Sequence, residues 1–428
     1  MSILDKTLER NPELIEAAIG LHQNGLIPPS TQVIDLDAVA LNSAVLTAAG
    51  EKHGLRVYAM TKQNGCNPHM TRVALDQGLH GVVAVESMQA FRIVRYGFPL
   101  GNVGHLSNVP KHQVRALVRT RPEFVTVYNH EAARRVSEAA KAEGIDQRLY
   151  VRVTNPDDGG PYPGMIGGWR EDDCVDGIRA LLDLPNVTVA GLTQHCAITY
   201  ETERDPETAR PSEAFFTTLR AKELLERELG LEDLHVNCAG NTNSVTFGML
   251  AGYGATEVEP GMALTGSAPF HAWHDMPEKP AQAIVTEILH HWEGEAYSLG
   301  GVFAFVWSAD PEVPLQCLVG RSFEQAKANR RQFEPRGVID YHGIFTGGGM
   351  EVGDTVAVVQ HPQHHVERGF TAAVSGISEG KPQVEGIFDT ACTALDASFN
   401  PLPLEEVMES LERTGRRYAG LPQTSHAG

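Results

Sequence analysis

Short runs of β-branched and apolar residues recur between residues 56 and 260, and most precede a stretch whose apolar residues return every three or four positions. The first pattern predicts a buried strand, and the second predicts an amphipathic helix. Strands that alternate with helices indicate βαβ units and a parallel sheet. The eight expected strands start at Arg56, Val82, Val103, Phe124, Leu149, Thr188, Leu234 and Thr256.

Eight strands over roughly 200 residues match the number and the size of a (β/α)8 TIM barrel. The alternative is a doubly wound open sheet, which we disfavour because no Gly-x-Gly-x-x-Gly motif follows a first strand. Helical periodicity fades after about residue 271, and short strands separated by Gly, Pro and His follow. The expected fold class is therefore α/β, a TIM barrel followed by a mainly β C-terminal domain.

These patterns divide the chain into four parts. They are an N-terminal helical leader (1–30), the barrel (31–270), a C-terminal β domain (271–403), and a charged helix with a polar tail (404–428). The leader should hold one polar helix at 11–22. The strand expected at 31–37 fits either the barrel or the β domain.

Composition and charge exclude several classes of protein. The 428 residues are 42% hydrophobic and 21% charged, an ordinary globular mixture. The formal net charge of −19 disfavours nucleic acid and anionic membrane surfaces as partners. No apolar run is long enough to span a membrane, and the charged N-terminus lacks the apolar core of a signal peptide. The six cysteines form no CxxC pair, which argues against a disulfide scaffold or a structural zinc site. We expect a cytoplasmic protein with no membrane or nucleic-acid partner.

Ionisable side chains gather at the expected strand ends, which form the catalytic mouth of a barrel. They are Lys62, Glu86, His105, Arg152, His195 and Glu259. Lys62 follows an apolar run, so burial should lower the pKa of its amine and make it a nucleophile toward aldehydes; the alternative is a solvated lysine at the rim. Glu259 should lie near the barrel axis, or form a salt bridge with an arginine such as Arg152.

Two further motifs allow a functional and a structural interpretation. The turn at 237–244 (NCAGNTNS) follows a strand and can bind a phosphate, although Asn and Thr also cap helices. His361, His364 and His365 lie in a proline-containing segment without a carboxylate pattern. We interpret that segment as a solvated loop and expect no metal site.

Taken together, these motifs resemble a known family, the fold type III pyridoxal-phosphate enzymes of the alanine racemase family, and within it the YhfX-like branch. Five segments carry the resemblance, in the family's order. They are 33–38 with Asn42, 58–64, 191–197, 243–244 and 259–266.

The resemblance implies pyridoxal 5'-phosphate as the cofactor and a role for each matching position. Lys62 would hold the cofactor through a Schiff base and then move the α-proton of an amino-acid substrate. His195 would stack on the pyridine ring, and Arg152 would lie beside the ring or the substrate carboxylate. Glu259 would keep the ring nitrogen protonated, where alanine racemase carries an arginine. The phosphate would be bound by Thr242, Asn243, Ser244 and the backbone N–H groups of Gly261 and Met262.

The second acid–base group of the racemases, a tyrosine in a Tyr-x-Asp-Gly setting, has no counterpart here. Tyr341 is our candidate and Cys392 is its rival; packing within the β domain is the alternative for both. The resemblance also implies a head-to-tail homodimer, in which the β domain of one subunit completes the site of the other.

The expected function is that of an amino-acid racemase, an isomerase in which Lys62 takes the α-proton on one face and Tyr341 returns it on the other. A decarboxylase or aldolase of the same fold is the first alternative, favoured by Glu259 and Cys392. A non-catalytic carrier of pyridoxal phosphate is the second. The β domain disfavours it, because such carriers are bare barrels.

Overall fold

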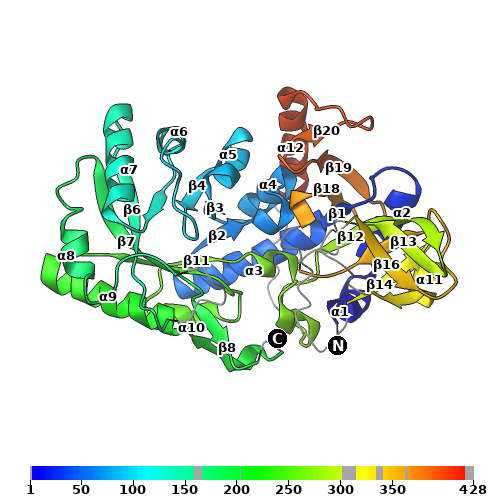
Figure 1. Cartoon of the computed structure of the whole chain (residues 1–428), viewed down its shortest axis with the longest axis horizontal. Coiled ribbons are helices and arrows are strands. Elements are labelled where there is room, and N and C mark those ends of the chain that lie inside the picture. Colours follow the sequence, from blue (N-terminus) through cyan, green and yellow to red (C-terminus); the bar gives the residue numbers. More distant parts are fainter. Residues whose placement is uncertain are drawn as a thin grey trace.

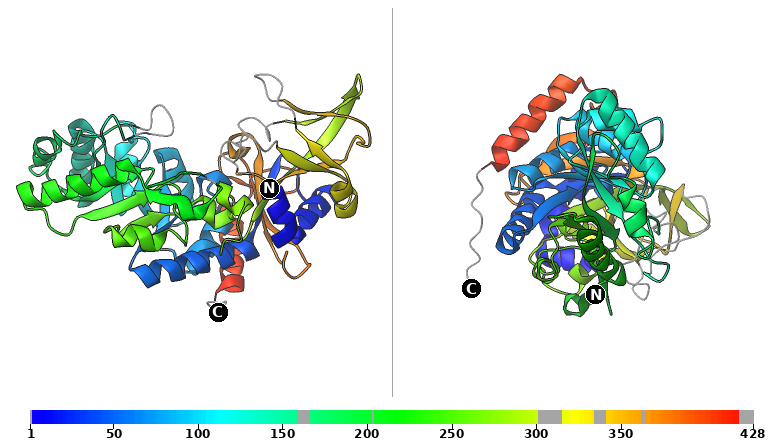
Figure 2. Two further views of the ribbon diagram at one scale, coloured as in Figure 1. Left: turned by 90° about the horizontal axis from the view of Figure 1, so that it is seen from below. Right: turned by 90° about the vertical axis from the view of Figure 1, so that its left-hand side faces the viewer.

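A barrel and a second, mainly antiparallel sheet lie side by side and give the molecule an elongated shape (Figure 1 and Figure 2). The structure is a computed structural model that describes residues 2–158, 166–202, 204–300, 315–333, 341–361 and 365–419. The polar tail expected at the C-terminus lies mostly outside the described residues.

Eight parallel strands close into a barrel in the order β10-β11-β2-β3-β4-β5-β6-β7. They are β2 (Arg56–Met60), β3 (Gly81–Ala84), β4 (Leu100–Val103), β5 (Phe124–Val127), β6 (Gln147–Arg152), β7 (Val187–His195), β10 (His235–Ala239) and β11 (Glu257–Glu259). The predicted fold class is confirmed. One predicted strand is displaced, because β4 ends at Val103, where the strand was expected to start.

Helices surround the barrel. They are α3 (Leu36–His53), α4 (Pro68–Asp76), α5 (Ser87–Arg95), α6 (Val114–Arg119), α7 (His130–Glu143), α8 (Cys174–Arg179), α9 (Glu213–Leu229) and α10 (Phe247–Gly252). Helix α3 precedes the first barrel strand and contacts α4 and α10, so it takes the place in the ring that follows β11. A short hairpin of β8 (Ile198–Tyr200) and β9 (Ala209–Pro211) precedes α9.

Local sequence explains the ends of the longest of these helices. A side-chain oxygen caps the first backbone N–H groups, and a glycine with left-handed φ ends the helix. The pairs are Asp35 and Gly54 for α3, Asn129 and Gly144 for α7, and Ser212 and Gly230 for α9.

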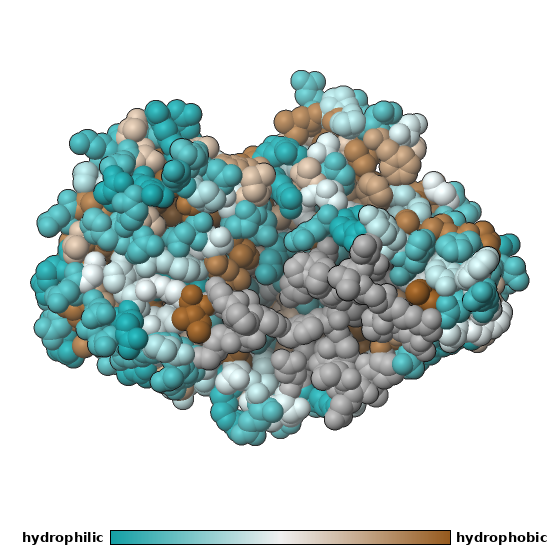
Figure 3. Space-filling view, viewed as in Figure 1, coloured by the Kyte–Doolittle hydropathy of each residue, from teal (hydrophilic) through white to brown (hydrophobic). Residues whose placement is uncertain are grey.

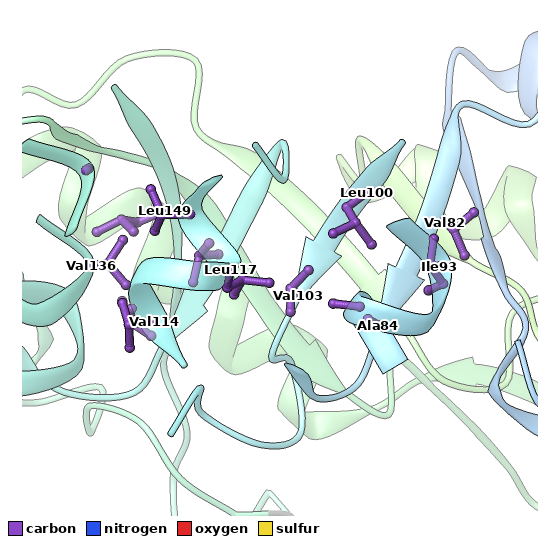
Figure 4. Close-up of a cluster of buried hydrophobic side chains, with 14 of the residues drawn as sticks. Val82, Ala84, Ile93, Leu100, Val103, Val114, Leu117, Val136 and Leu149 are labelled. Atoms are coloured by element: carbon purple, nitrogen blue, oxygen red, sulfur yellow. The ribbon is translucent and has the colours of Figure 1, made fainter. Parts of the chain in front are cut away.

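The barrel strands alternate between an apolar outer face and a polar inner face. Outward side chains such as Val82, Val103 and Leu149 pack against helix residues such as Ile93 and Val136 (Figure 4). The inner face carries Asn102, Thr126, Thr193, Asn237 and Glu257, all buried. Barrel interiors are usually filled by branched aliphatic side chains, and buried polar groups need partners. Here Thr126 donates to Asn102 at 2.7 Å and Asn237 donates to Thr193 at 2.8 Å, so a hydrogen-bonded network underlies the mouth.

The second sheet has ten strands, with β1 (Thr31–Asp35) in its interior between β12 and β18. The strand expected at 31–37 therefore belongs to this sheet and not to the barrel. It pairs antiparallel with β12 and parallel with β18. The remaining strands are β12 (Gln282–Trp292), β13 (Glu295–Leu299), β14 (Gln316–Gly320), β15 (Arg330–Gln332), β16 (His342–Thr346), β17 (Thr355–Val358), β18 (Phe370–Ser375), β19 (Gln383–Phe388) and β20 (Ala394–Leu395).

The remaining helices cover the second sheet and its junction with the barrel. They are α1 (Ile3–Arg10), α2 (Pro12–Gln23), α11 (Phe323–Ala328) and α12 (Leu404–Tyr418). The prediction of a single polar helix at 11–22 was incomplete: α1 precedes it, and α2 buries Leu14, Ile15 and Ile19 in a cluster with Val33 of β1. Helix α12 lies above the junction in Figure 1.

The face of the molecule in Figure 3 is mostly hydrophilic, with small separate hydrophobic patches. Among the helices that the structure describes, none is long and apolar enough to cross a membrane.

Candidate active site

The ends of five barrel strands bring ionisable side chains together at one mouth. Lys62 follows β2, His105 follows β4, and Arg152, His195 and Glu259 end β6, β7 and β11. Burial lowers the pKa of both histidines, and the positive charge of Lys62 adds to the effect on each. The mouth therefore holds two basic side chains, one carboxyl group and two imidazoles.

Lys62 lies where the barrel meets the second sheet. Its side chain is half-buried, and loss of hydration lowers the pKa of its amine, while nearby Cys196 and Glu367 act in the opposite direction. It begins the short helix η1 (Lys62–Asn64), which contacts η5 (His365–Glu367) of the second sheet's domain. A larger fraction of this amine is uncharged at neutral pH than of a solvated lysine.

Glu259 is a buried carboxyl group in which one oxygen accepts two hydrogen bonds. Its Oε1 accepts hydrogen bonds from Asn102 Nδ2 at 3.1 Å and from Asn237 Nδ2 at 2.8 Å. Oε2 has no hydrogen-bond partner among the described residues. Burial raises the pKa of Glu259 to about 7 and Glu257 acts in the same direction, although the two amides oppose them.

His105, His195 and Arg152 form the wall beside Glu259. The two imidazole rings are stacked, with centroids 6.0 Å apart and an interplanar angle of 23°. Burial lowers the pKa of His195 to about 3, with smaller contributions from Lys62 and Arg152, and burial lowers that of His105 well below its ordinary value. Both imidazoles are therefore neutral at physiological pH.

The turn at 241–244 presents unused hydroxyl groups. Thr242 Oγ1 and Ser244 Oγ are buried and have no hydrogen-bond partner in the described part of the chain. Asn243 holds the turn in place, because its Nδ2 donates to Tyr200 Oη at 3.2 Å and its Oδ1 accepts from Val245 N at 3.2 Å. Two buried hydroxyl groups without a hydrogen-bond partner among the described residues fit an oxyanion.

Gly261 lies directly against the segment that carries Lys62. A Cβ at this position would lie 3.1 Å from both Met60 Cγ and Gln63 Nε2, so a larger residue would crowd the side chains on either side of Lys62. Met262 follows at the start of η3 (Met262–Thr265). The close approach explains the glycine in the Glu-Pro-Gly turn.

The interpretation of the histidine cluster as a solvated loop was wrong for the residues that the structure describes. His361 and His365 are buried, and His361 Nδ1 lies 3.1 Å from Ser267 Oγ. Burial lowers the pKa of His361 to about 3, and the charge of Lys62 adds to the effect, which indicates that this imidazole lies near the amine. His361 and His365 are covered where the two domains meet. His364 lies outside the described residues.

Sequence reasoning also missed two polar pairs at the mouth. Cys196 Sγ lies 3.3 Å from His195 Nδ1. Glu278, which precedes β12, is buried and accepts a hydrogen bond from Ser244 N, and His271 lies beside it. For Cys196 the strand end was a usable signal, whereas no local pattern marks Glu278. Across the described ranges, no group of three or more His, Cys, Asp or Glu side chains is arranged to hold a metal ion.

The two candidates for the second acid–base group lie in different places. Tyr341 is 64% exposed at the edge of the second sheet, with its ring centroid 5.7 Å from the guanidinium of Arg368, the neighbour of Glu367. Cys392 is fully buried, and its Sγ donates to Cys66 O at 3.4 Å. Tyr341 thus lies exposed beside a residue that follows η5, whereas Cys392 packs against the outside of the barrel.

The sequence matches two family models that together span most of the chain. The alanine racemase N-terminal domain matches residues 34–269, and the YhfX-like C-terminal domain matches residues 283–384. The chain belongs to the alanine racemase family of barrel proteins. Within it, the chain belongs to the YhfX-like branch: it is 31% identical to the uncharacterized protein YhfX of Escherichia coli K12 over 389 residues, 91% of this chain and 98% of that protein.

The solved structures that resemble this chain are enzymes named for different reactions. D-threonine aldolase from Filomicrobium marinum has a TM-score of 0.63 and 21% identity, covering 86% of this chain and 96% of its own. D-threo-3-hydroxyaspartate dehydratase from Delftia sp. HT23 has a TM-score of 0.61 and 16% sequence identity, and the match covers 83% of this chain and 96% of the dehydratase. Alanine racemase from Clostridium difficile 630 has a TM-score of 0.59 and 14% sequence identity, and the match covers 85% of this chain and 99% of the racemase. The fold is shared by a racemase, an aldolase and a dehydratase, so the fold does not select the reaction.

Proposed function

We propose that this protein is a pyridoxal 5'-phosphate-dependent amino-acid racemase. The lysine and the phosphate-binding turn at the mouth both fit this cofactor. Lys62 is an amine of lowered pKa that can condense with an aldehyde. The hydroxyls of Thr242 and Ser244 are unused donors for phosphate oxygens, and Asn243 with the backbone of Gly261 and Met262 would complete that binding site.

Glu259 is the observation that carries the cofactor part of the proposal. A buried carboxyl group with one saturated and one unpartnered oxygen is costly unless a donor completes it. A protonated pyridine nitrogen is such a donor. A pKa of about 7 lets Glu259 accept or hold that proton near neutral pH.

Each residue then has a defined task. Bound pyridoxal phosphate withdraws electrons from the α-carbon of an amino acid attached to it. Lys62 removes the α-proton, which its lowered pKa permits near neutral pH. Glu259 would hold a proton for the ring nitrogen, and His195, which is neutral, would lie beside the ring without adding charge. Arg152 supplies a positive charge for the ring or the substrate carboxylate.

Racemisation also needs an acid that returns the proton on the face opposite Lys62. Tyr341 remains our candidate, because it is a tyrosine of the second domain whose side chain is exposed. Its exposure is consistent with a contribution across the head-to-tail homodimer that we propose. Sedimentation of the purified protein would test that dimer.

A lyase is the second candidate, and His361 is the observation that favours it. A neutral imidazole near Lys62 can accept a proton from the β-hydroxyl of a substrate, the step that begins cleavage of the bond between the α- and β-carbons. A carrier without activity is disfavoured, because the second domain places His361 and Glu367 close to the amine.

The test is α-proton exchange in deuterated water. The protein is loaded with pyridoxal phosphate and incubated with a panel of D- and L-amino acids that includes β-hydroxy amino acids, with Lys62→Ala as the control. Deuterium at the α-carbon with appearance of the opposite enantiomer supports the racemase. Loss of a β-hydroxy amino acid with release of an aldehyde would replace it by the lyase. Bound cofactor without exchange would leave only the carrier.

A further inference from the structure

His105 occupies a forced position inside the barrel mouth. It follows β4 and Gly104, whose φ of +96° lies in the left-handed region that favours glycine. A Cβ on Gly104 would lie 3.2 Å from Ser107 O and 3.4 Å from Thr126 O. The glycine therefore lets the chain turn tightly and direct the next side chain into the barrel, where His105 is 2% exposed.

From this position His105 touches three groups at the mouth. Its Nδ1 lies 3.4 Å from Glu259 Oε2, and its ring stacks on that of His195. Its carbonyl oxygen accepts hydrogen bonds from Arg152 Nη1 at 2.7 Å and from Tyr128 Oη at 2.6 Å. A single residue thus joins the carboxyl group, the second imidazole and the guanidinium.

The contact with Glu259 has a chemical direction. Both amide donors serve Oε1, whereas neither Oε2 nor His105 Nδ1 has a hydrogen-bond partner among the described residues, although these two atoms lie 3.4 Å apart. A neutral imidazole carries one N–H, and in the tautomer protonated at Nδ1 a small reorientation of the ring would let it donate to the carboxylate. A carboxylate oxygen accepts two hydrogen bonds, so this bond leaves one acceptor site on Oε2 for a second donor.

We propose that His105 is a positioning residue that donates from Nδ1 to Glu259 Oε2, stabilises the ionised carboxylate and aims that oxygen at the ring nitrogen of the cofactor. This inference rests on the proposed function for its cofactor, but the pair of residues can be tested without it. The groups that face Glu259 are Asn102, Asn237, Glu257, Tyr150 and His105. Lys62, Arg152 and His195 lie around His105.

The first experiment is a double-mutant cycle on the dissociation constant of pyridoxal phosphate. His105→Phe keeps an aromatic ring beside His195 but removes Nδ1, and His105→Asn keeps an N–H donor at that position. We expect His105→Phe to weaken binding about 10-fold or more, as for a lost hydrogen bond to a charged group. In a Glu259→Gln background it should change binding less than about twofold, and His105→Asn alone should stay within about threefold of wild type. Equal weakening in both backgrounds would mean that His105 only packs, and would overturn the proposal.

The second experiment uses the protein without cofactor. The apparent pKa of Glu259 is obtained from the pH dependence of Tm, as the difference between wild type and Glu259→Gln. Repeating the pair with His105→Phe should move that pKa upward, because a donor to the ionised form is lost. An unmoved pKa would overturn the proposal. If wild type bound no pyridoxal phosphate, the proposed function would fail while this measurement would still decide the role of His105.

Discussion

The backbone N–H of Ser244 donates a hydrogen bond of 2.9 Å to Oε1 of Glu278, a carboxylate with no exposed surface. Its Oε2 lies 3.7 Å from His271 Nε2. Burial alone would raise the pKa of Glu278, but His271 and the Ser244 N–H lower it below its ordinary value. An ionised carboxylate therefore anchors the turn that we assign to the phosphate.

This anchor predicts different results for two substitutions of Glu278. Glu278→Ala removes the acceptor, so the turn loosens and the affinity for pyridoxal phosphate should fall about 10-fold. Glu278→Gln keeps an acceptor oxygen and should remain within about threefold of wild type. Titration followed by absorbance measures both, with pyridoxal as the ligand that lacks the phosphate. Equal losses for pyridoxal and its phosphate would contradict a role at the phosphate turn.

Lys62 should be essential for both the cofactor signal and the exchange. Lys62→Ala should lose the visible absorption band of the bound cofactor, and its α-proton exchange should fall at least about 10³-fold, since nucleophile and base are both removed. Lys62→Arg keeps the positive charge and should fail equally. Exchange at the wild-type rate in either variant would exclude the assignment.

Glu259 should make the stability of the cofactor-free protein depend on pH. Its folded pKa of about 7 exceeds the ordinary value of 4.5, so the folded state binds more protons between these values. Stability should therefore fall as pH rises from 4.5 to 7, by about 3 kcal/mol, and level off above. Glu259→Gln should remove this fall in a plot of Tm against pH. A wild-type profile that runs parallel to that of the variant would show an ordinary pKa.

Tyr341 and Cys392 should behave differently because of where they lie. Tyr341→Phe removes the proton donor that we propose for the face opposite Lys62, so racemisation should fall about 10²-fold or more while deuterium exchange with retained configuration continues. Cys392→Ser places a hydroxyl in a fully buried site and should lower Tm without changing the ratio of exchange to racemisation. Chiral chromatography with mass detection measures both rates. Unchanged racemisation in Tyr341→Phe would remove Tyr341 as the second acid.

Gly104 should be more sensitive to alanine than another glycine with positive φ. Gly104→Ala combines left-handed backbone strain with contacts of 3.2 and 3.4 Å to carbonyl oxygens, and we expect a loss of about 2–3 kcal/mol. Gly54 has a φ of +69° and open space around it, so Gly54→Ala should lose only about 1 kcal/mol. Chemical denaturation gives both values. Equal losses would mean that the turn before His105 adjusts freely.

The barrel was predictable because its signals are local. Alternation of outward apolar and inward polar residues, as in Glu257, Val258 and Glu259, identifies a strand and its end within a few positions. The surroundings of His361 were not predictable, because its burial depends on how the second domain meets the barrel. The partners of β1 were equally hidden, since they lie some 250 and 340 residues further along the chain. Strands that pair across so many residues leave no local pattern in the sequence that identifies their partners.

The position of β1 has a consequence for how the chain becomes a protein. Thr31–Asp35 leaves the ribosome early, but its neighbours β12 and β18 follow only after the whole barrel has been made. In the order of the chain, the barrel is therefore inserted between strands of the second sheet, and the two are not consecutive domains. A C-terminal fragment expressed alone would lack this interior strand. A cut at any position within the barrel should therefore not give two halves that fold independently.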